Sequence, residues 1–337
     1  MKKTFLIGSI FALSLFVSAC GAKENNAQSG TQSNGSYPIK INNYTKAEGS
    51  TKWEPKEETF QEAPHKIMAN TKPAAELLLH LGLEDKIVGV GADFGEPDKA
   101  VEKAYSKLPI LSKDYVGKEV TLGTNPDFVY GRAGLFDNNE WGVGTVDSLN
   151  DSGIRTYLLE SSVTGGTFDS IYQDIDNLGK IFNVEDKAKS FAAEIKAKET
   201  TLTTSLKKIN QNQTFAYIHT MDPTEIAVYP AHDESFFNDI FKLIKLDNVY
   251  KNEKGDVSIE TLLETDPDIL IFPIWEDGAD IAKIKAGFYA NPKLTNMKAI
   301  KNKQVYGVDY NYLFGYGYQS LDGIEKLATE IYPDLFN

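Results

Sequence analysis

One pattern occurs twice in this chain, as Glu119-Val-Thr-Leu-Gly-Thr-Asn-Pro-Asp-Phe-Val129 and again as Glu260-Thr-Leu-Leu-Glu-Thr-Asp-Pro-Asp-Ile-Leu270. In both copies a glutamate lies seven residues before a Pro-Asp pair, and the pair leads directly into an apolar run. Each copy predicts a short helix, a turn set by proline and a buried strand, at 128–130 and 269–272. Because the spacing of the glutamate also matches, duplication explains the pair better than coincidence. We therefore expect two similar halves.

The region before the first copy has the pattern of a strand–helix–strand unit. His65–Asn70 is typical of a short strand, and Pro73 suits the first turn of a helix over 74–81. Gly82 ends that helix, and Ile87–Val90 predicts the next strand. Units of this kind build parallel sheets.

A long stretch with few helix breakers separates the two copies. Residues 168–206 carry apolar side chains at helical spacing, with an interruption near Asn183. Further strands at 214–218 and 226–229 and a final helix at 321–331 follow. This order predicts an α/β fold of two Rossmann-like lobes joined by one long helix, with a ligand cleft between them.

The first nineteen residues are typical of a secretory signal peptide. Lys2 and Lys3 precede an apolar run from 5 to 17, which is too short to span a membrane. The sequence Val17-Ser-Ala-Cys20 resembles a bacterial lipobox, which implies a lipid on Cys20 and cleavage before it. Cys20 is the only cysteine, so it has no disulfide partner. We expect a lipid-anchored protein on the extracytoplasmic face of the cell membrane.

The polar composition after Cys20 predicts a flexible tether, because such a segment cannot bury enough apolar surface to offset its ordering entropy. The predicted domains are a signal peptide at 1–19, the lipidated cysteine and tether at 20–50, a first lobe at 51–167, a linker helix region at 168–206 and a second lobe at 207–337.

Charge and motifs exclude several classes of protein. The formal charge of −13 argues against nucleic-acid binding, which needs a basic face. The sequence has no Gly-x-Ser-x-Gly motif, no phosphate-binding glycine loop, no zinc-ligand spacing and no cysteine nucleophile, so we expect neither an enzyme nor a bound cofactor. A surface adhesin would keep the anchor and tether but would not need the duplicated halves.

Besides the lipobox, the tether and the two Glu-x6-Pro-Asp units, the sequence contains a further motif, Asn70-x-x-Pro-Ala-Ala-Glu-Leu-Leu-x-x-Leu-Gly82. Together they resemble the helical-backbone (class III) solute-binding lipoproteins of ABC importers for ferric siderophores, haem and vitamin B12. The resemblance implies two αβ lobes on a rather rigid helix, slight closure around the ligand, and an ABC permease with its ATPase as partners. It also implies that Glu119 and Glu260 dock on permease arginines. The alternative is that both are ordinary first-turn helix carboxylates.

Ligand contacts in such a fold are expected in loops that follow strands. Arg132 lies between glycines after the first Pro-Asp strand, where a guanidinium suits carboxylate or hydroxamate oxygens, although a surface ion pair is the alternative. An unusual aromatic segment near the end of the chain predicts one wall of the site. The candidate ligand-binding residues are Phe94, Arg132, Trp141, Trp275, Tyr310, Tyr312, Phe314, Tyr316 and Tyr318.

The predicted ligand is an iron(III)–siderophore complex, with a hydroxamate type favoured. Vitamin B12 or a cobinamide is the alternative, and haem is the third. For haem, His219 would be the candidate axial ligand. No cluster of His, Asp and Glu predicts a site for a bare metal ion. We expect the protein to act as a monomer.

Overall fold

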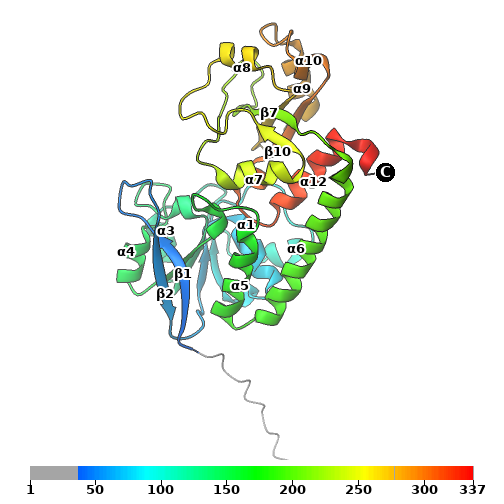
Figure 1. The fold of residues 1–337 in the computed structure, drawn as a ribbon. Helices are drawn as coiled ribbons and strands as arrows, with labels where there is room; N and C mark the ends of the chain where they lie inside the picture. The colour runs from blue at the N-terminus through cyan, green and yellow to red at the C-terminus, as the bar shows by residue number, and fades with distance from the viewer. Residues whose placement is uncertain (1–36, 277, 337) are drawn as a thin grey trace, which may run out of the picture. The chain divides into compact units, whose positions relative to one another are not determined.

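The computed structural model describes residues 37–276 and 278–336 (Figure 1). The predicted signal peptide, Cys20 and the tether up to residue 36 lie outside these residues. Strand β1 (Ile39–Thr45) already belongs to the folded body. Strand β1 lies within the segment predicted as tether (20–50), and its alternating residues Ile41 and Asn43 are buried, so this part of the segment is folded. Among the described helices, none has the length and apolar character needed to cross a membrane.

The first lobe is built on a four-stranded parallel sheet in the order β4-β3-β5-β6. The predicted strands of this lobe are all present, with ends that differ by a residue or two. The strands are β3 (Ile67–Ala69), β4 (Ile87–Val90), β5 (Phe128–Gly131) and β6 (Arg155–Leu158). The helices are α1 (Lys72–His80), α2 (Glu102–Tyr105), α3 (Lys118–Gly123) and α4 (Val146–Asp151).

The second lobe is built on a parallel sheet in the order β10-β9-β7-β8. The predicted strand at 226–229 is wrong: Val228 makes only isolated antiparallel bridges, to Ile218 and Val257. The strands are β7 (Gln213–Tyr217), β8 (Leu246–Asn248), β9 (Ile269–Ile274) and β10 (Val305–Asp309). The helices are α7 (Ser235–Leu243), α8 (Ile259–Thr265), α9 (Ile281–Ala290), α10 (Lys298–Lys301), α11 (Tyr310–Phe314) and α12 (Ser320–Ile331).

The two sheets have the same topology. In each lobe the first strand in sequence lies between the second and the third, and the fourth strand lies at the edge beyond the third. This shared order confirms the two similar halves expected from the repeated pattern. The predicted α/β fold with two lobes is therefore correct.

The Pro-Asp pairs have the same structural role in both lobes. Asp127 accepts hydrogen bonds from the backbone N–H groups of His65 (2.9 Å) and Lys66 (2.8 Å), just before β3. Asp268 accepts from the backbone N–H and the hydroxyl of Thr214 in β7 (3.0 and 2.8 Å). Each aspartate thus ties the start of the third strand to the start of the first. That shared task explains why the pattern recurs.

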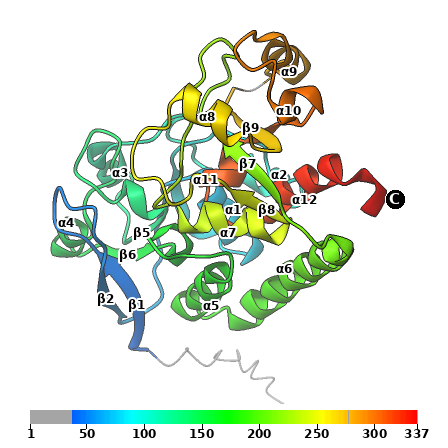
Figure 2. The same cartoon turned by 45° about the horizontal axis from the view of Figure 1, so that its top comes forward.

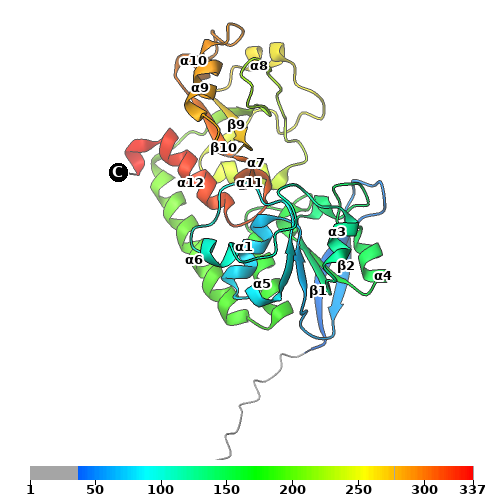
Figure 3. The same cartoon turned by 180° about the vertical axis from the view of Figure 1, so that it is seen from behind.

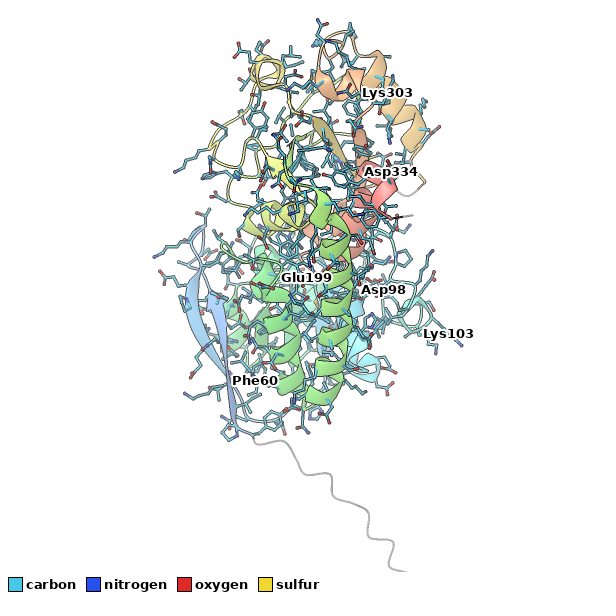
Figure 4. The ribbon with its side chains drawn as sticks, turned by 45° about the vertical axis from the view of Figure 1, so that its right-hand side comes forward. Phe60, Asp98, Lys103, Glu199, Lys303 and Asp334 are labelled. Carbon is cyan, nitrogen blue, oxygen red and sulfur yellow. The ribbon has the colours of Figure 1, made fainter. Side chains whose placement is uncertain are left out.

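The linker is a helical hairpin rather than a single rod. Helix α5 (Ser170–Phe182) ends at Asn183, which has a left-handed backbone (φ 55°), and α6 (Glu185–Ser205) follows. The interruption predicted near Asn183 is therefore confirmed. Tyr172 of α5 donates to Glu199 of α6 (2.5 Å), and Glu199 is labelled on the long helix in Figure 4. Figure 2 shows α5 and α6 side by side, with α6 leading on to β7.

An N-terminal hairpin packs against the edge of the first sheet. Strands β1 and β2 (Glu54–Phe60) pair antiparallel and lie beside α3 and α4 in Figures 1 and 3. Asn43 of β1 donates to the carbonyl of Thr156 (2.9 Å) and accepts from the N–H of Leu158 (3.2 Å), both in β6. The side-chain amide thereby makes the backbone hydrogen bonds that a neighbouring strand would make. It protects an edge that would otherwise expose unpaired backbone groups.

One apolar core runs through both lobes. A single cluster of buried side chains includes Phe128 of β5, Phe191 of α6, Phe237 of α7 and Ile271 of β9. Two smaller clusters lie on the outer faces of the two sheets. Because the main core is continuous across the linker, large movements between the lobes would separate buried apolar surface.

Candidate ligand-binding site

The candidate site begins at the carboxyl ends of the central strands. In each sheet the second strand lies on one side of the first strand and the third strand lies on its other side, so the strand order changes direction between the first and the third. Open α/β sheets bind ligands at such switch points. Arg132 follows β5, whereas His219 and Trp275 follow β7 and β9 in the other lobe. The topology therefore places these three side chains at the two switch points.

The backbone of Arg132 is fixed by Asn70, which follows the neighbouring strand β3. The Asn70 side chain accepts from the Arg132 N–H (2.8 Å) and donates to the Arg132 carbonyl (3.0 Å). Gly131 has φ 138°, and a Cβ at this position would overlap the Asn70 side-chain oxygen. Glycine is thus required before Arg132, both for the backbone angle and for this close approach.

The Arg132 side chain reaches from the first lobe to the second. Its guanidinium donates to the hydroxyl of Tyr115 (3.0 Å) and lies 5.1 Å from the ring centre of Tyr316. The Tyr316 hydroxyl donates in turn to Glu234 (2.6 Å). Most of the N–H groups of the guanidinium do not take part in these contacts. The half-buried arginine can therefore still bind an oxygen-rich ligand.

An aromatic cavity of about 450 Å³ is lined by Tyr115, whose hydroxyl accepts the hydrogen bond from Arg132. It takes residues from both lobes, and its size falls within the range of small-molecule sites. Phe94 packs edge-on against Tyr115 (5.6 Å between ring centres), and Trp275 lies 6.4 Å from Tyr310. The lining residues are Asp93, Phe94, Lys113, Asp114, Tyr115, His219, Trp275 and Tyr310.

His219 stands at one side of this cavity, edge-on to Trp275 (5.4 Å between ring centres). Burial lowers the pKa of His219 below its ordinary value, so the imidazole is neutral at pH 7. A neutral imidazole is the form that can bind a metal.

A second cavity of about 200 Å³ is lined by Arg132 and Tyr316. Arg132 links it to the aromatic cavity through its hydrogen bond to Tyr115, which lines the aromatic one. The lining of the second cavity is mainly polar and again comes from both lobes. The lining residues are Trp53, Arg132, Gly134, Ser161, Ser162, Val163, Thr164, Asp233, Glu234, Ser235, Phe236 and Tyr316.

Four of the predicted site residues do not line these cavities. Trp141 is 52% exposed on the loop before α4. Phe314 is buried in the second lobe, where it stacks on Phe237 (5.1 Å between ring centres). Tyr312 and Tyr318 form hydrogen bonds with carboxylates of the first lobe and line neither cavity. Of the other predicted residues, Phe94, Trp275 and Tyr310 line the aromatic cavity, and Arg132 and Tyr316 line the second cavity.

Tyr312 and Tyr318 instead belong to a polar joint between the lobes. Tyr318 donates to Asp98 (2.5 Å), and Tyr312 donates to Glu96 (3.0 Å). In the same joint Gln319 donates to Glu76 (2.8 Å), a carboxyl that is only 1% exposed. Burial raises the pKa of Glu76 to about 7. The joint and the shared core hold the two lobes together.

The two predicted docking glutamates occupy matching places on the lobes. Glu119 lies in the first turn of α3 and Glu260 in the first turn of α8, and both are exposed. Each has an exposed leucine three residues later, Leu122 and Leu263. A glutamate and an apolar side chain thus form the same small surface on each lobe.

Sequence reasoning missed several residues of the site. Tyr115 and Lys113 lie in a loop with no strand signal before it, and Glu234 looked like one more surface carboxylate. Asn70 could have been found, because it opens the motif quoted above and immediately follows a predicted strand. No group of three or more His, Cys, Asp and Glu able to hold a metal ion occurs among the residues that the structure describes.

Two lobes of one topology, joined by a helical linker and meeting at an aromatic cavity, define a solute-binding protein. Residues 67–312 match the periplasmic binding protein family, and the chain belongs to that family. It is a substrate-binding protein of ABC importers and not an enzyme, as the sequence resemblance implied.

The chain is similar to known proteins along nearly its whole length. The ABC transporter substrate-binding lipoprotein YvrC of Bacillus subtilis strain 168, itself uncharacterized, is 22% identical over 341 residues that cover 99% of each chain. The Fe(3+)-citrate-binding protein YfmC of the same bacterium is 25% identical, over 91% of this chain and 90% of its own. A solved structure of an ABC-type Fe3+-hydroxamate transport system from Saccharomonospora viridis DSM 43017 has a TM-score of 0.68 at 21% identity, covering 88% of this chain and 99% of that one.

Proposed function

We propose that this protein captures an iron(III) chelate, of the hydroxamate type, between its two lobes and delivers it to an ABC permease. The observation that carries the proposal is the aromatic cavity with Arg132 at its side. Aromatic rings provide a rigid wall for the organic part of a chelate, and the guanidinium offers donors to chelating oxygens. The relatives named for ferric citrate and ferric hydroxamate support iron as the cargo.

The charges around the two cavities support a chelate of low net charge. Cations are few there: Arg132 and Lys113 line the cavities, and Lys72 lies 3.5 Å from Asp93. The carboxylates that line them are Asp93, Asp114, Asp233 and Glu234. A chelate with several negative charges would meet this acidic surround at close range. A ferric trihydroxamate, in which three anionic groups balance the charge of iron(III), avoids that repulsion.

Titration of the purified protein tests the proposal. A linear ferric trihydroxamate, ferric citrate, cobalamin and haem would be added separately while tryptophan fluorescence is followed. Trp275 lines the cavity, so the expected result is saturable quenching at submicromolar ferric trihydroxamate and a weaker response to ferric citrate. Saturation by cobalamin alone would replace the proposal with its alternative. No saturable response to any iron chelate would contradict it.

Haem is the second candidate, because His219 lines the same cavity in its neutral form. Haem bound through His219 would show a shifted Soret band that disappears in His219→Ala. For a ferric trihydroxamate, which has no open iron position, the same substitution should change affinity only slightly.

We also propose that lipid on Cys20 anchors the protein outside the cell membrane. Glu119 and Glu260, one on each lobe, would then contact paired basic sites on the permease. Their matched exposure at the start of α3 and α8 supports this arrangement.

A further inference from the structure

We infer that the N-terminal hairpin is part of the ligand site, and that Trp53 contacts the organic backbone of the bound chelate. This inference rests on the proposed function and adds a specificity-determining residue to it. The family match begins at residue 67, after the hairpin has ended. The hairpin therefore lies outside the region that the family model matches.

The loop of the hairpin is tied to the first lobe near Arg132. Lys46 forms an ion pair with Asp137 (2.8 Å), and both side chains are mostly buried. The same ammonium group lies 5.1 Å from the ring centre of Trp53. Together with the Asn43 clamp on β6, these contacts hold the loop and its tryptophan in one position.

The Trp53 ring has two environments. Part of it packs against the outer apolar cluster of the first lobe. Another part lines the 200 Å³ cavity, together with Arg132 and Tyr316. A ring that served only to cover the core would not need to border a cavity shared by both lobes. Arg132 lines this cavity together with Trp53, and it bonds Tyr115, which lines the aromatic cavity. A ligand held by Arg132 could therefore extend towards Trp53.

The chemistry of the second cavity suits the linking chain of a chelate rather than its iron centre. Hydroxyl groups of Thr164 and Ser235 line it and can bond amide groups of a siderophore backbone. Trp53 adds a rigid apolar surface against which methylene units can pack. The iron-binding groups would then lie on the other side of Arg132, among the aromatic rings.

Affinity measurements on substituted proteins test this inference. The probe is the linear ferric trihydroxamate used above, and the readouts are Kd by calorimetry and the thermal midpoint of unfolding. Trp53→Ala should weaken binding about tenfold, the loss typical of an aromatic contact at an interface. Trp53→Leu keeps apolar cover over the lobe but removes the ring, so it should retain the wild-type thermal midpoint and still lose affinity.

The matched control is Trp141→Ala, which removes a tryptophan from an exposed loop of the same lobe. Its Kd should stay within about twofold of wild type. Wild-type Kd in a folded Trp53→Leu protein would overturn the inference while leaving the proposed function intact. Absence of binding to the wild-type protein would instead reject the proposed function, and this inference with it.

Discussion

Arg132 owes its position to neighbours that are distant in sequence. Asn70 holds its backbone, Gly131 permits the close approach, and Tyr115 and Tyr316 hold its guanidinium between the lobes. The sequence alone predicted the arginine, because a cation between glycines after a strand is badly placed for core packing. It named Tyr316 as a site residue but not Tyr115, and it could not predict that both would contact Arg132, since their approach depends on how two loops fold.

Arg132→Ala should weaken chelate binding by about 10- to 100-fold, the loss expected for hydrogen bonds to a charged group. Arg132→Lys should recover only part of this loss, because an ammonium group lacks the planar fork. Calorimetric Kd values, with thermal unfolding as the control for folding, check the prediction. Unchanged affinity in Arg132→Ala would remove this residue from the site.

Glu76 gives the joint between the lobes a pH dependence. Burial raises its pKa from an ordinary 4.5 to about 7. Between these values the folded protein holds a proton that the unfolded chain has released, so the free energy of unfolding should fall as pH rises from 4.5 to 7. Burial raises the pKa of Asp174 to about 7 as well, and this shift acts in the same direction.

Urea unfolding at pH 5 and pH 7.5 would measure this fall in stability, and Glu76→Gln should reduce it. The glutamine stays neutral at both pH values. The amide oxygen of Gln319, which is buried and has no hydrogen-bond partner among the described residues, can accept from it after an amide flip. An equal dependence on pH in Glu76→Gln and wild type would show that Glu76 is not responsible.

At the scale of elements, repetition made much of the fold predictable. The strands after the Pro-Asp pairs, the unit from β3 to β4, the break at Asn183 and the final helix α12 all occur close to their predicted places. Elements without a copy or a strong pattern were missed. Strand β8 has three residues, and the polar β1 is stabilised by pairing with β2 and by the Asn43 clamp, both tertiary effects.

The aromatic segment at 310–318 shows why alternation misled the prediction. Its first five residues form α11, in which residues two apart point to opposite sides of a helix and residues four apart share a side. Tyr310 therefore lines the cavity and lies at a tilt to Phe314, with 4.9 Å between the ring centres, whereas Tyr312 lies on the other side of the helix. A wall of five aromatics would have required an extended strand.

The Pro-Asp pairs should contribute to stability in both lobes. Asp268→Ala leaves the Thr214 N–H and hydroxyl without their acceptor and should cost about 1–3 kcal/mol. Asp256→Ala is the control, because Asp256 is exposed and makes no hydrogen bond or ion pair within the described part of the chain. Urea unfolding of both variants checks the prediction. Equal stability would show that the repeated aspartate has no structural role.

At the scale of the whole molecule, the continuous core and the polar joint indicate limited closure around the ligand. Binding would then be signalled mainly by the relative positions of the two matched surfaces at Glu119 and Glu260. Lobes that share a topology present these surfaces as a pair, and a permease with two related basic sites could recognise both at once.

Replacing Glu119 and Glu260 together by alanine should abolish uptake of the chelate and leave its Kd unchanged, since neither residue lines the aromatic cavity or the second cavity. Uptake of labelled iron in cells that carry only the variant would measure the first effect, and calorimetry the second. Glu140→Ala with Glu264→Ala removes the same charge from other exposed positions and should transport normally. Normal uptake by the first pair would reject the docking role.

The location of iron in a complex tests the central claim most directly. Crystals grown with a ferric trihydroxamate and measured at the iron absorption edge would give an anomalous peak at the metal. We predict one peak between Arg132 and the rings of Phe94, Trp275 and Tyr310. A peak elsewhere, with these side chains in contact only with each other, would contradict the account.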